Sequence, residues 1–382
     1  MKSLSRLMIT ALCVFALLPI SNAIGESTPI AKSFEVAKGG NLVVDIENAG
    51  ASVDVKVWSK LEVAVTANGI REQDLKDLKI EKVGNTVNVF FDPGNGWENR
   101  RPVRFTINVP SEFNLDVATS GGDVDVTGSI EGTVEAATAG GDITVDDVNG
   151  TVELRTAGGD ITAGNVDGDA QLKTAGGDIE VGDVTGTLAA ATAGGDIDAG
   201  KVTKDLAAQT AGGDITCAGV GGEAEVETAG GSIELGVVKG EAKAKTAGGN
   251  IEILGATGEV AAATAGGDIK LAGITGSVNA ETAGGDIYVE LVPTNAFASS
   301  METKGGDIGL YLPANAKATI EARIRLRDWN RRDTEEYDIL SDFEAELHDK
   351  SEREVRARYV INGGGKVIKI ETVNGNIEIR KQ

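Results

Sequence analysis

The six residues T-A-G-G-D-I at positions 138–143 decide the fold of this chain. The same phrase begins again at 156, 174, 192, 210, 264 and 282, and TAGGSI at 228 and TAGGNI at 246 fill the gaps between them. The nine copies are therefore spaced 18 residues apart. A fixed short period of this kind indicates a repeat architecture, in which each unit buries its apolar side chains by stacking on its neighbours.

Apolar residues recur at fixed places in each unit. Counted from the Thr as zero, position five is Ile in all nine copies, and positions seven, ten, fourteen and sixteen are mostly Val, Leu, Ile or Ala. Steps of two residues are typical of strands, and the odd steps between clusters mark corners. Between 119 and 290, no stretch keeps the apolar period of a helix. The pattern predicts an all-β chain, a single-stranded parallel β-solenoid (β-helix) with 18-residue rungs and β-rich capping regions.

The phrase itself predicts a corner. Alternation places each Thr inward, where its hydroxyl can satisfy a backbone amide or carbonyl of the turn. The two Gly are expected to supply the positive φ angles of a sharp bend. The Asp residues from Asp142 to Asp286 then form a ladder, which must be either hydrogen-bonded to turn amides or neutralised by cations. Ser232 and Asn250 replace Asp in two rungs, and because Ser and Asn also cap turns, we favour the turn role.

A calcium-binding β-roll is the competing interpretation of the ladder, because calcium-binding nonapeptide repeats give a rung of the same length. Those repeats carry a further Gly between the Gly pair and the Asp, twice in each rung. Here Asp follows Gly-Gly directly, and the second half of a rung has a lone Gly such as Gly150. We therefore predict no metal site and no cofactor.

The first 23 residues predict an export signal. Lys2 and Arg6 precede an apolar stretch from Leu7 to Ile20, and Ser21-Asn22-Ala23 supplies small residues for signal cleavage. The apolar stretch is shorter than the roughly 20 residues of a membrane-spanning helix, so we expect no integral membrane anchor after cleavage. The formal net charge of −23 repels nucleic acid and anionic membrane surfaces, and neither is expected as a partner.

The remaining sequence divides into three parts. Residues 24–115 alternate as strands and predict a β-rich lead-in or cap, residues 116–310 form the repeat solenoid, and residues 311–382 predict C-terminal strands with a charged insertion at 328–352. Within the solenoid, Glu225 and Glu227 are expected to lie beside Lys243 and Lys245 of the next rung. Small outward residues leave other rungs flat on the same face: Ala189, Ala191, Ala207, Ala261 and Ala263.

This arrangement resembles the bacterial "putative adhesin" family of exported β-solenoid domains of unknown function. The resemblance is carried by Gly50-Ala51-Ser52-Val53-Asp54-Val55 with Trp58, the Val109-Pro110 step, the Gly-Gly-Asp-Ile rungs, Gly363-Gly364-Gly365 and Asn374-Gly375-Asn376-Ile377. It covers nearly all of the chain after the signal. The resemblance implies the fold and export, either to the periplasm or to the cell surface.

A polysaccharide-active β-helix enzyme is the other alternative. Such a site needs clustered acids and aromatic platforms, yet between 119 and 290 the sole aromatic is Tyr288. His348 lies in the charged insertion without identifiable partners, and Cys217 occupies an apolar position of the repeat, where a buried thiol is expected. The repeated Asp residues share one environment, which gives no differentiated acid and base. We predict a non-catalytic cell-envelope protein with no catalytic residues.

Partner binding is expected at the ends of the stack. Exposed Trp beside Arg is typical of contact hot spots, and packing of the Trp against the caps with Arg stacked on the ring is the alternative. Two segments outside the regular repeat have this composition, and their candidate residues are Trp97, Arg100, Arg101, Trp329, Arg331 and Arg332. The partner is expected to be an envelope protein or a surface glycan.

Overall fold

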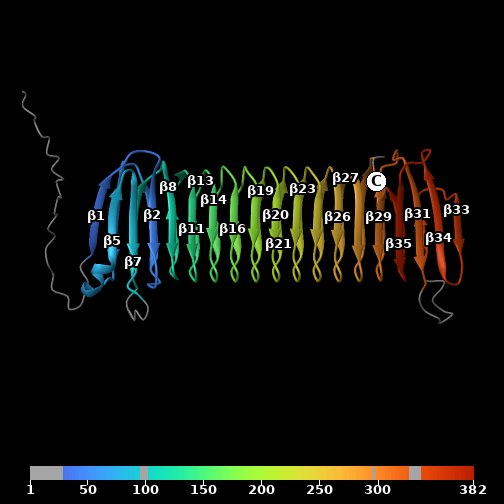
Figure 1. Cartoon of the computed structure of the whole chain (residues 1–382). Helices are drawn as coiled ribbons and strands as arrows, with labels where there is room; N and C mark the ends of the chain where they lie inside the picture. The colour runs from blue at the N-terminus through green and yellow to red at the C-terminus, as the bar shows by residue number, and fades with distance from the viewer. Residues whose placement is uncertain (1–28, 95–101, 295–296, 327–336) are drawn as a thin grey trace, which may run out of the picture.

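The computed structural model describes residues 29–94, 102–294, 297–326 and 337–382. In this part of the chain, short strands follow one another in a long row from the blue to the red end of Figure 1, which we call the rod. One short 3₁₀ helix, η1 (Glu72–Asp77), is the helical element of the described chain. No described helix is long and apolar enough to cross a membrane.

Each rung of the repeat supplies strands to two sheets that enclose the core between them. In spatial order from the N-terminal end of the rod, the first sheet contains β1 (Ile30–Glu35), β4 (Glu62–Asn68), β7 (Arg104–Pro110), β3 (Ser52–Trp58), β9 (Val124–Thr127), β12 (Ile143–Val145), β15 (Ile161–Ala163), β17 (Ile179–Val181), β19 (Ile197–Val202), β21 (Ile215–Val220), β23 (Ile233–Val238), β25 (Ile251–Ala256), β27 (Ile269–Thr282), β28 (Ile287–Pro293), β30 (Ile308–Leu312), β36 (Ile377–Lys381) and β32 (Ile339–Ser341).

The second sheet runs alongside the first. Its strands, in the same direction, are β5 (Leu78–Val83), β6 (Thr86–Phe91), β2 (Gly40–Ile46), β8 (Phe113–Thr119), β11 (Val134–Thr138), β14 (Val152–Arg155), β16 (Ala170–Lys173), β18 (Leu188–Ala191), β20 (Leu206–Gln209), β22 (Ala224–Glu227), β24 (Ala242–Lys245), β26 (Glu259–Ala263), the second half of β27, β29 (Ser299–Thr303), β35 (Val367–Val373), β31 (Ala318–Arg325), β34 (Glu354–Ile361) and β33 (Leu347–Lys350).

Position ten of the repeat makes a third, much shorter contact between rungs. There β10 (Ile130–Glu131) pairs with β13 (Val148–Asn149) in parallel, and single parallel bridges join Val148 to Val166, Val166 to Val184 and Val184 to Val202. The earlier coils therefore have two main strands and one short edge, whereas from β19 on the same position belongs to the strand of the first sheet.

Equivalent residues of successive rungs lie side by side because the pairing is parallel and keeps the register of the repeat. Ile143 pairs with Ile161, and Ile161 pairs in turn with Ile179. These three Ile side chains are at most 1% exposed, whereas the residues that follow them point outward. A column of identical side chains thus fills the core, since one rung alone buries no face. The prediction of a parallel β-solenoid is confirmed.

The rungs nearest the two ends are not in sequence order. β2 and β3 lie between the β6–β7 rung and the β8–β9 rung, although they precede both in the chain. Likewise β35 and β36, the last strands of the chain, lie between the β29–β30 rung and the β31–β32 rung. The C-terminus therefore lies within the row and not at its end (Figure 1).

Antiparallel strands close the parallel stack at both ends. At the N-terminal end, β1 pairs with β4, β4 with β7, and β5 with β6; at the C-terminal end, β34 pairs with both β31 and β33. The larger core side chains gather near these ends, where Phe91, Phe105, Phe113 and Tyr359 are buried. They close a core that elsewhere consists mainly of Val, Ile, Leu and Ala, and the antiparallel strands pair with strand edges that a bare solenoid would leave open.

Candidate functional site: corners and outer faces of the rod

The Thr of each repeat ties one rung to the previous one. The hydroxyl of Thr156 donates a hydrogen bond to the carbonyl oxygen of Gly141 at 2.8 Å and accepts one from the amide of Gly159 at 3.3 Å. Both partners are corner groups with no strand partner, and the buried hydroxyl satisfies them. The donor bond recurs at Thr119, Thr138, Thr156, Thr174, Thr192, Thr210, Thr228, Thr246, Thr264, Thr282, Thr303 and Thr372, all of which are buried.

The Asp of each repeat makes a second ladder outside the first. Oδ1 of Asp160 accepts a hydrogen bond from the backbone amide of Asp178 at 2.8 Å, and Oδ1 of Asp178 accepts one from the amide of Asp196 at 2.8 Å. The acceptors of this corner ladder are Asp123, Asp142, Asp160, Asp178, Asp196, Asp214, Ser232, Asn250, Asp268, Asp286, Asp307 and Asn376. The side-chain oxygens of Ser232 and Asn250 continue it, as expected for turn capping.

The prediction that the paired Gly supply positive φ angles is wrong. The left-handed Gly residues of the described chain include Gly150 and Gly276, but none of the Gly pairs from 140–141 to 284–285. The second Gly of each pair is needed for space instead. A Cβ on Gly159 would lie 2.2 Å from the carbonyl oxygen of Gly141, because the backbones of neighbouring rungs touch at this corner.

The diverged copies at both ends belong to the same ladders. The hydroxyl of Thr119 donates to the carbonyl oxygen of Ala51 at 2.7 Å, and that of Thr372 donates to the carbonyl oxygen of Gly306 at 2.6 Å. The amide of Asn376 donates to Oδ1 of Asp307 at 2.6 Å. The residues 50–55 and 372–377, which carry part of the family resemblance, therefore take part in the corners of the stack.

Because the corner residues are engaged by the backbone, interaction chemistry is left to the outward side chains. On the second sheet, the Nζ atom of Lys243 lies 2.5 Å from Oε1 of Glu225, and that of Lys245 lies 3.1 Å from Oε1 of Glu227. These pairs confirm the predicted complementary rows. They are exposed, so they set the stacking order more than they stabilise the fold. The outward Ala residues, among them Ala189 and Ala207, flatten the neighbouring rungs.

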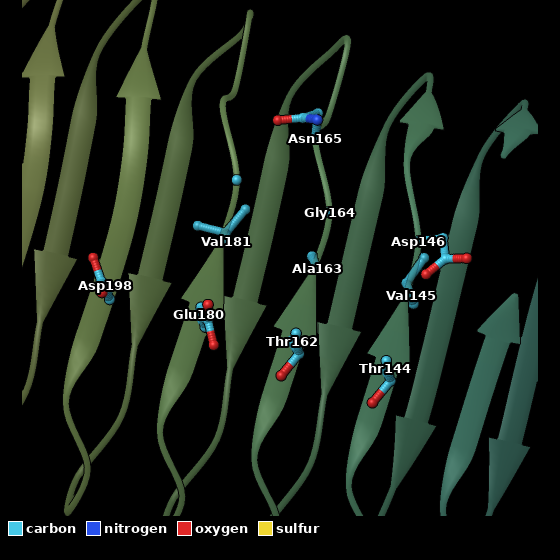
Figure 2. A pocket seen from close by; sticks show the side chains of 11 residues that line it. Thr144, Val145, Asp146, Thr162, Ala163, Gly164, Asn165, Glu180, Val181 and Asp198 are labelled. Atoms are coloured by element: carbon cyan, nitrogen blue, oxygen red, sulfur yellow. The ribbon is translucent and has the colours of Figure 1, made fainter. Parts of the chain in front are cut away.

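A shallow depression lies on the outer face of the first sheet, across β12, β15, β17 and β19 (Figure 2). It has a volume of about 400 Å³, and Thr144, Thr162, Glu180 and Asp198 point into it in a row from successive strands. Small residues at the bend, such as Gly164, leave the space open. The lining offers hydroxyl and carboxylate oxygens but neither an aromatic ring nor a basic side chain. Glu180 and Asp198 occupy equivalent positions of successive repeats, which gives these two carboxyl groups similar surroundings.

One group of aromatic side chains breaks the regular outer surface. Tyr288 of β28 and Tyr311 of β30 lie on the outer face of the first sheet with ring centroids 4.6 Å apart. Between 119 and 290, Tyr288 is the sole aromatic residue of the sequence, and Tyr311 lies beyond that range. The pattern that would have found its partner is the Gly309-Leu310-Tyr311 stretch of the diverged rung, since alternation places Gly309 and Tyr311 on the same face as Tyr288.

The residues predicted to bind a partner lie outside the described part of the chain: Trp97, Arg100, Arg101, Trp329, Arg331 and Arg332. The predicted export signal lies outside it as well. His348 is described and lies in the exposed strand β33, with Nε2 3.3 Å from Oδ1 of Asp338. Cys217 is buried as expected, with Sγ 3.3 Å from the carbonyl oxygen of Gly200, and burial raises the pKa of its thiol.

The chain matches one family model, described as Toastrack DUF4097, over residues 43–218 and again over residues 200–380. Among solved structures, it is similar to a "putative cell adhesion protein" from Clostridium sporogenes ATCC 15579, with 8% identity, coverage of 93% of this chain and 100% of that chain, and a TM-score of 0.18.

Two further solved structures are similar at the same level. A "putative adhesin" from Bacteroides fragilis NCTC 9343 has 12% identity, 93% and 97% coverage and a TM-score of 0.23. A "putative lipid binding protein" from Parabacteroides distasonis ATCC 8503 has 13% identity, 74% and 96% coverage and a TM-score of 0.22. No curated protein matches the chain.

Proposed function

This chain belongs to the Toastrack DUF4097 family, and we propose that it is a non-catalytic rod of the bacterial cell envelope that presents interaction surfaces on its outer faces. The observation that carries this proposal is the use of the repeated polar residues. The Thr hydroxyls and Asp side chains of the corners bond to the backbone of neighbouring rungs along almost the whole stack. The repeated residues therefore stabilise the stack of rungs, and the variable outward side chains are the ones that are available to bind partners.

The carboxylates of the corner ladder are unsuited to acid and base catalysis. An acid and base pair requires two carboxyl groups whose environments hold their pKa values apart. The Asp residues of the corner ladder share one environment, in which each Oδ1 accepts an amide hydrogen bond from the next rung. Such a ladder stabilises an extended surface and favours a scaffold or an adhesin-like role.

The composition of the first 23 residues supports the envelope location. The N-terminal charges Lys2 and Arg6, the short apolar stretch after them and the small residues at 21–23 have the composition of a signal that is cleaved during secretion. The acidic surface suits a partner that is neutral or basic, and we propose an envelope protein or a surface glycan, with no role for nucleic acid.

Fractionation of cells that make the protein tests the location. Intact cells are treated with a protease, and the chain is then detected with an antibody alongside one cytosolic and one periplasmic marker. Loss of the chain with both markers intact supports surface display, and protection until the outer envelope is opened supports the periplasm. Full-length chain that remains with the cytosolic marker contradicts the proposal.

The non-catalytic part needs a separate measurement. The purified chain is incubated with a panel of neutral and acidic polysaccharides, and new reducing ends or unsaturated ends are measured over time. We expect no release above that of heat-treated protein. Turnover of any polysaccharide contradicts this part of the proposal and favours the enzyme alternative.

A further inference from the structure

The aromatic pair Tyr288 and Tyr311 lies beside a glycine, where the outer face of the sheet carries no side chain. Gly309 occupies the outward position of β30 that pairs with Tyr288. A Cβ at Gly309 would lie 3.1 Å from Cε2 of Tyr311 and 3.7 Å from Cδ2 of Tyr288. The ring of Tyr311 therefore reaches over the position that a side chain at residue 309 would fill.

This packing fixes how the rings are presented. The two ring planes differ by 37°, so the rings form a shallow tilted pair and not an edge-to-face contact. Both side chains keep part of their surface exposed. With centroids only 4.6 Å apart, each ring covers one face of the other, and the pair presents its outer ring faces and exposed edges as one apolar platform at low cost in side-chain entropy.

Hydrogen-bonding groups of both kinds surround the platform. Oη of Tyr288 donates to Oε1 of Glu290 at 2.7 Å. Arg380 pairs in register with Tyr311, and its guanidinium contacts Glu378 and Asp342, each at 3.3 Å. On the opposite side, Lys270 pairs in register with Tyr288 and lies 2.6 Å from Glu252. The rim thus offers fixed acceptors and fixed donors with no excess of positive charge.

We propose that the Tyr288–Tyr311 platform binds a neutral oligosaccharide. The C–H face of a pyranose ring packs against the negative face of an aromatic ring, and its hydroxyl groups can both accept from Arg380 and donate to the carboxylates of Glu290 and Glu378. A polyanion is disfavoured by the acidic chain, and a peptide would need more contiguous apolar area than two rings provide. This assignment rests on the proposed envelope function, and it names the ligand class for one of the rod's faces.

Affinity electrophoresis tests the assignment. The purified chain is run in native gels that contain a neutral β-glucan, a neutral galactomannan or a neutral xylan, and in a gel without polysaccharide. We expect retardation in at least one of the three. Tyr311→Ala and Tyr288→Ala should each weaken the retardation about tenfold, as the truncation of a binding hot spot does.

Matched variants separate the platform from the fold. Tyr311→Phe keeps the ring and should keep the binding, whereas Gly309→Val places a branched side chain under the ring of Tyr311 and should abolish it. Thr216→Ala changes an outward residue of the same sheet far along the rod and should change nothing. All variants are first compared by circular dichroism and melting temperature, so that a loss of binding is assigned only to folded protein.

Several results would overturn the assignment. One is that the wild-type chain is not retarded in any of the three gels, and another is that wild type and Tyr311→Ala are retarded equally. A third is that the chain binds a choline-bearing resin and none of the glycans, and that this binding is lost in Tyr311→Ala. Binding of sugar by a chain that fractionation places in the cytosol would contradict the envelope function and leave the platform intact. Surface display without sugar binding would do the reverse.

Discussion

Oδ1 of Asp142 accepts a hydrogen bond from the backbone amide of Asp160 over 2.9 Å, one rung further along the rod. The same contact recurs with Ser232 and Asn250 as acceptors. The corner therefore requires a short side chain with an acceptor oxygen, and the negative charge is incidental to it. Neighbouring carboxylates about 4.8 Å apart repel by less than about 1 kcal/mol where water solvates them, which the ladder tolerates.

Asp178 tests whether the oxygen or the charge matters. Asp178→Asn keeps an acceptor for the amide of Asp196 and removes one charge from the ladder. We expect its free energy of unfolding to stay within about 0.5 kcal/mol of the wild type. Asp178→Ala removes the acceptor and should cost about 0.5–1.5 kcal/mol. Urea denaturation of the two variants measures the difference, and equal losses would show that the charge is what the corner uses.

The first and second Gly of the corner phrase, represented by Gly140 in one rung and Gly159 in the next, predict opposite tolerance to a methyl group. Gly159→Ala places Cβ 2.2 Å from the carbonyl oxygen of Gly141 and 2.5 Å from Oδ1 of Asp142. Because backbone has to move, the cost should be about 1–3 kcal/mol or more. Gly140→Ala meets its nearest neighbour at 3.7 Å and should be nearly neutral. Melting temperatures of the two variants check this, and a larger loss for Gly140→Ala would contradict the stacking contact.

Neighbouring residues of one strand test the direction of the side chains. Ile197 is 1% exposed in the core, whereas Asp198 is exposed on the outer face of β19. Ile197→Asp buries an unpaired carboxylate and should cost several kcal/mol. Asp198→Asn should change the stability by at most about 0.5 kcal/mol. Similar melting temperatures for the two variants would mean that the register of the rung is wrong.

The sequence predicts the solenoid because the 18-residue period determines which residues pair on neighbouring strands. In a parallel stack, residues one repeat apart become neighbours, so Ile143 beside Ile161 and Glu225 beside Lys243 follow directly from the 18-residue spacing. The inward Thr follows from alternation. In this fold, a separation of one repeat in the sequence means adjacent strands in space. The inward positions of the repeat could therefore be assigned one by one from the sequence.

Other features depend on information that the period does not contain. Gly159 is required because the backbone of the previous rung approaches it closely. The distance between two backbones cannot be derived from the sequence of one rung. The rungs at the ends, such as β35–β36 between earlier strands, break the sequence order. The platform joins Tyr288 to Tyr311 across a rung that carries inserted residues, since Thr303 follows Thr282 by 21 positions and not 18.

The phenol of Tyr288 predicts a pH dependence. Burial and the hydrogen bond to Glu290 raise its pKa to about 12 from the usual 10.0. A pKa raised by folding contributes stability that is present below the unfolded value and is lost as the pH rises through the folded value. The difference in phenolate absorbance between wild type and Tyr288→Phe should therefore have a midpoint near 12. A midpoint near 10 would mean that neither the burial of the phenol nor its contact with Glu290 is present.

Calcium is expected to add no stability to the rod. In the corner ladder, Oδ1 of each Asp already accepts an amide hydrogen bond, so a chelated ion would have to compete with the contacts that hold neighbouring rungs together. Ser232 follows Asp214 in the corner ladder and has no carboxylate, so a row of calcium ions along the ladder would lack a ligand there. We expect the melting temperature and the circular dichroism spectrum to be the same in calcium and in a chelator.

Bound calcium would stabilise the rod by an amount that is easily measured. Calcium at a hundredfold excess over its dissociation constant would stabilise a rod with one binding site by about 2.7 kcal/mol, and a row of sites would add to that value. Asp178→Asn is the matched control, because it keeps the amide contact and weakens any calcium site at the same position. A β signal that collapses in chelator, returns with calcium but not with magnesium, and responds less to calcium in Asp178→Asn would overturn the turn-capping account and favour a calcium roll.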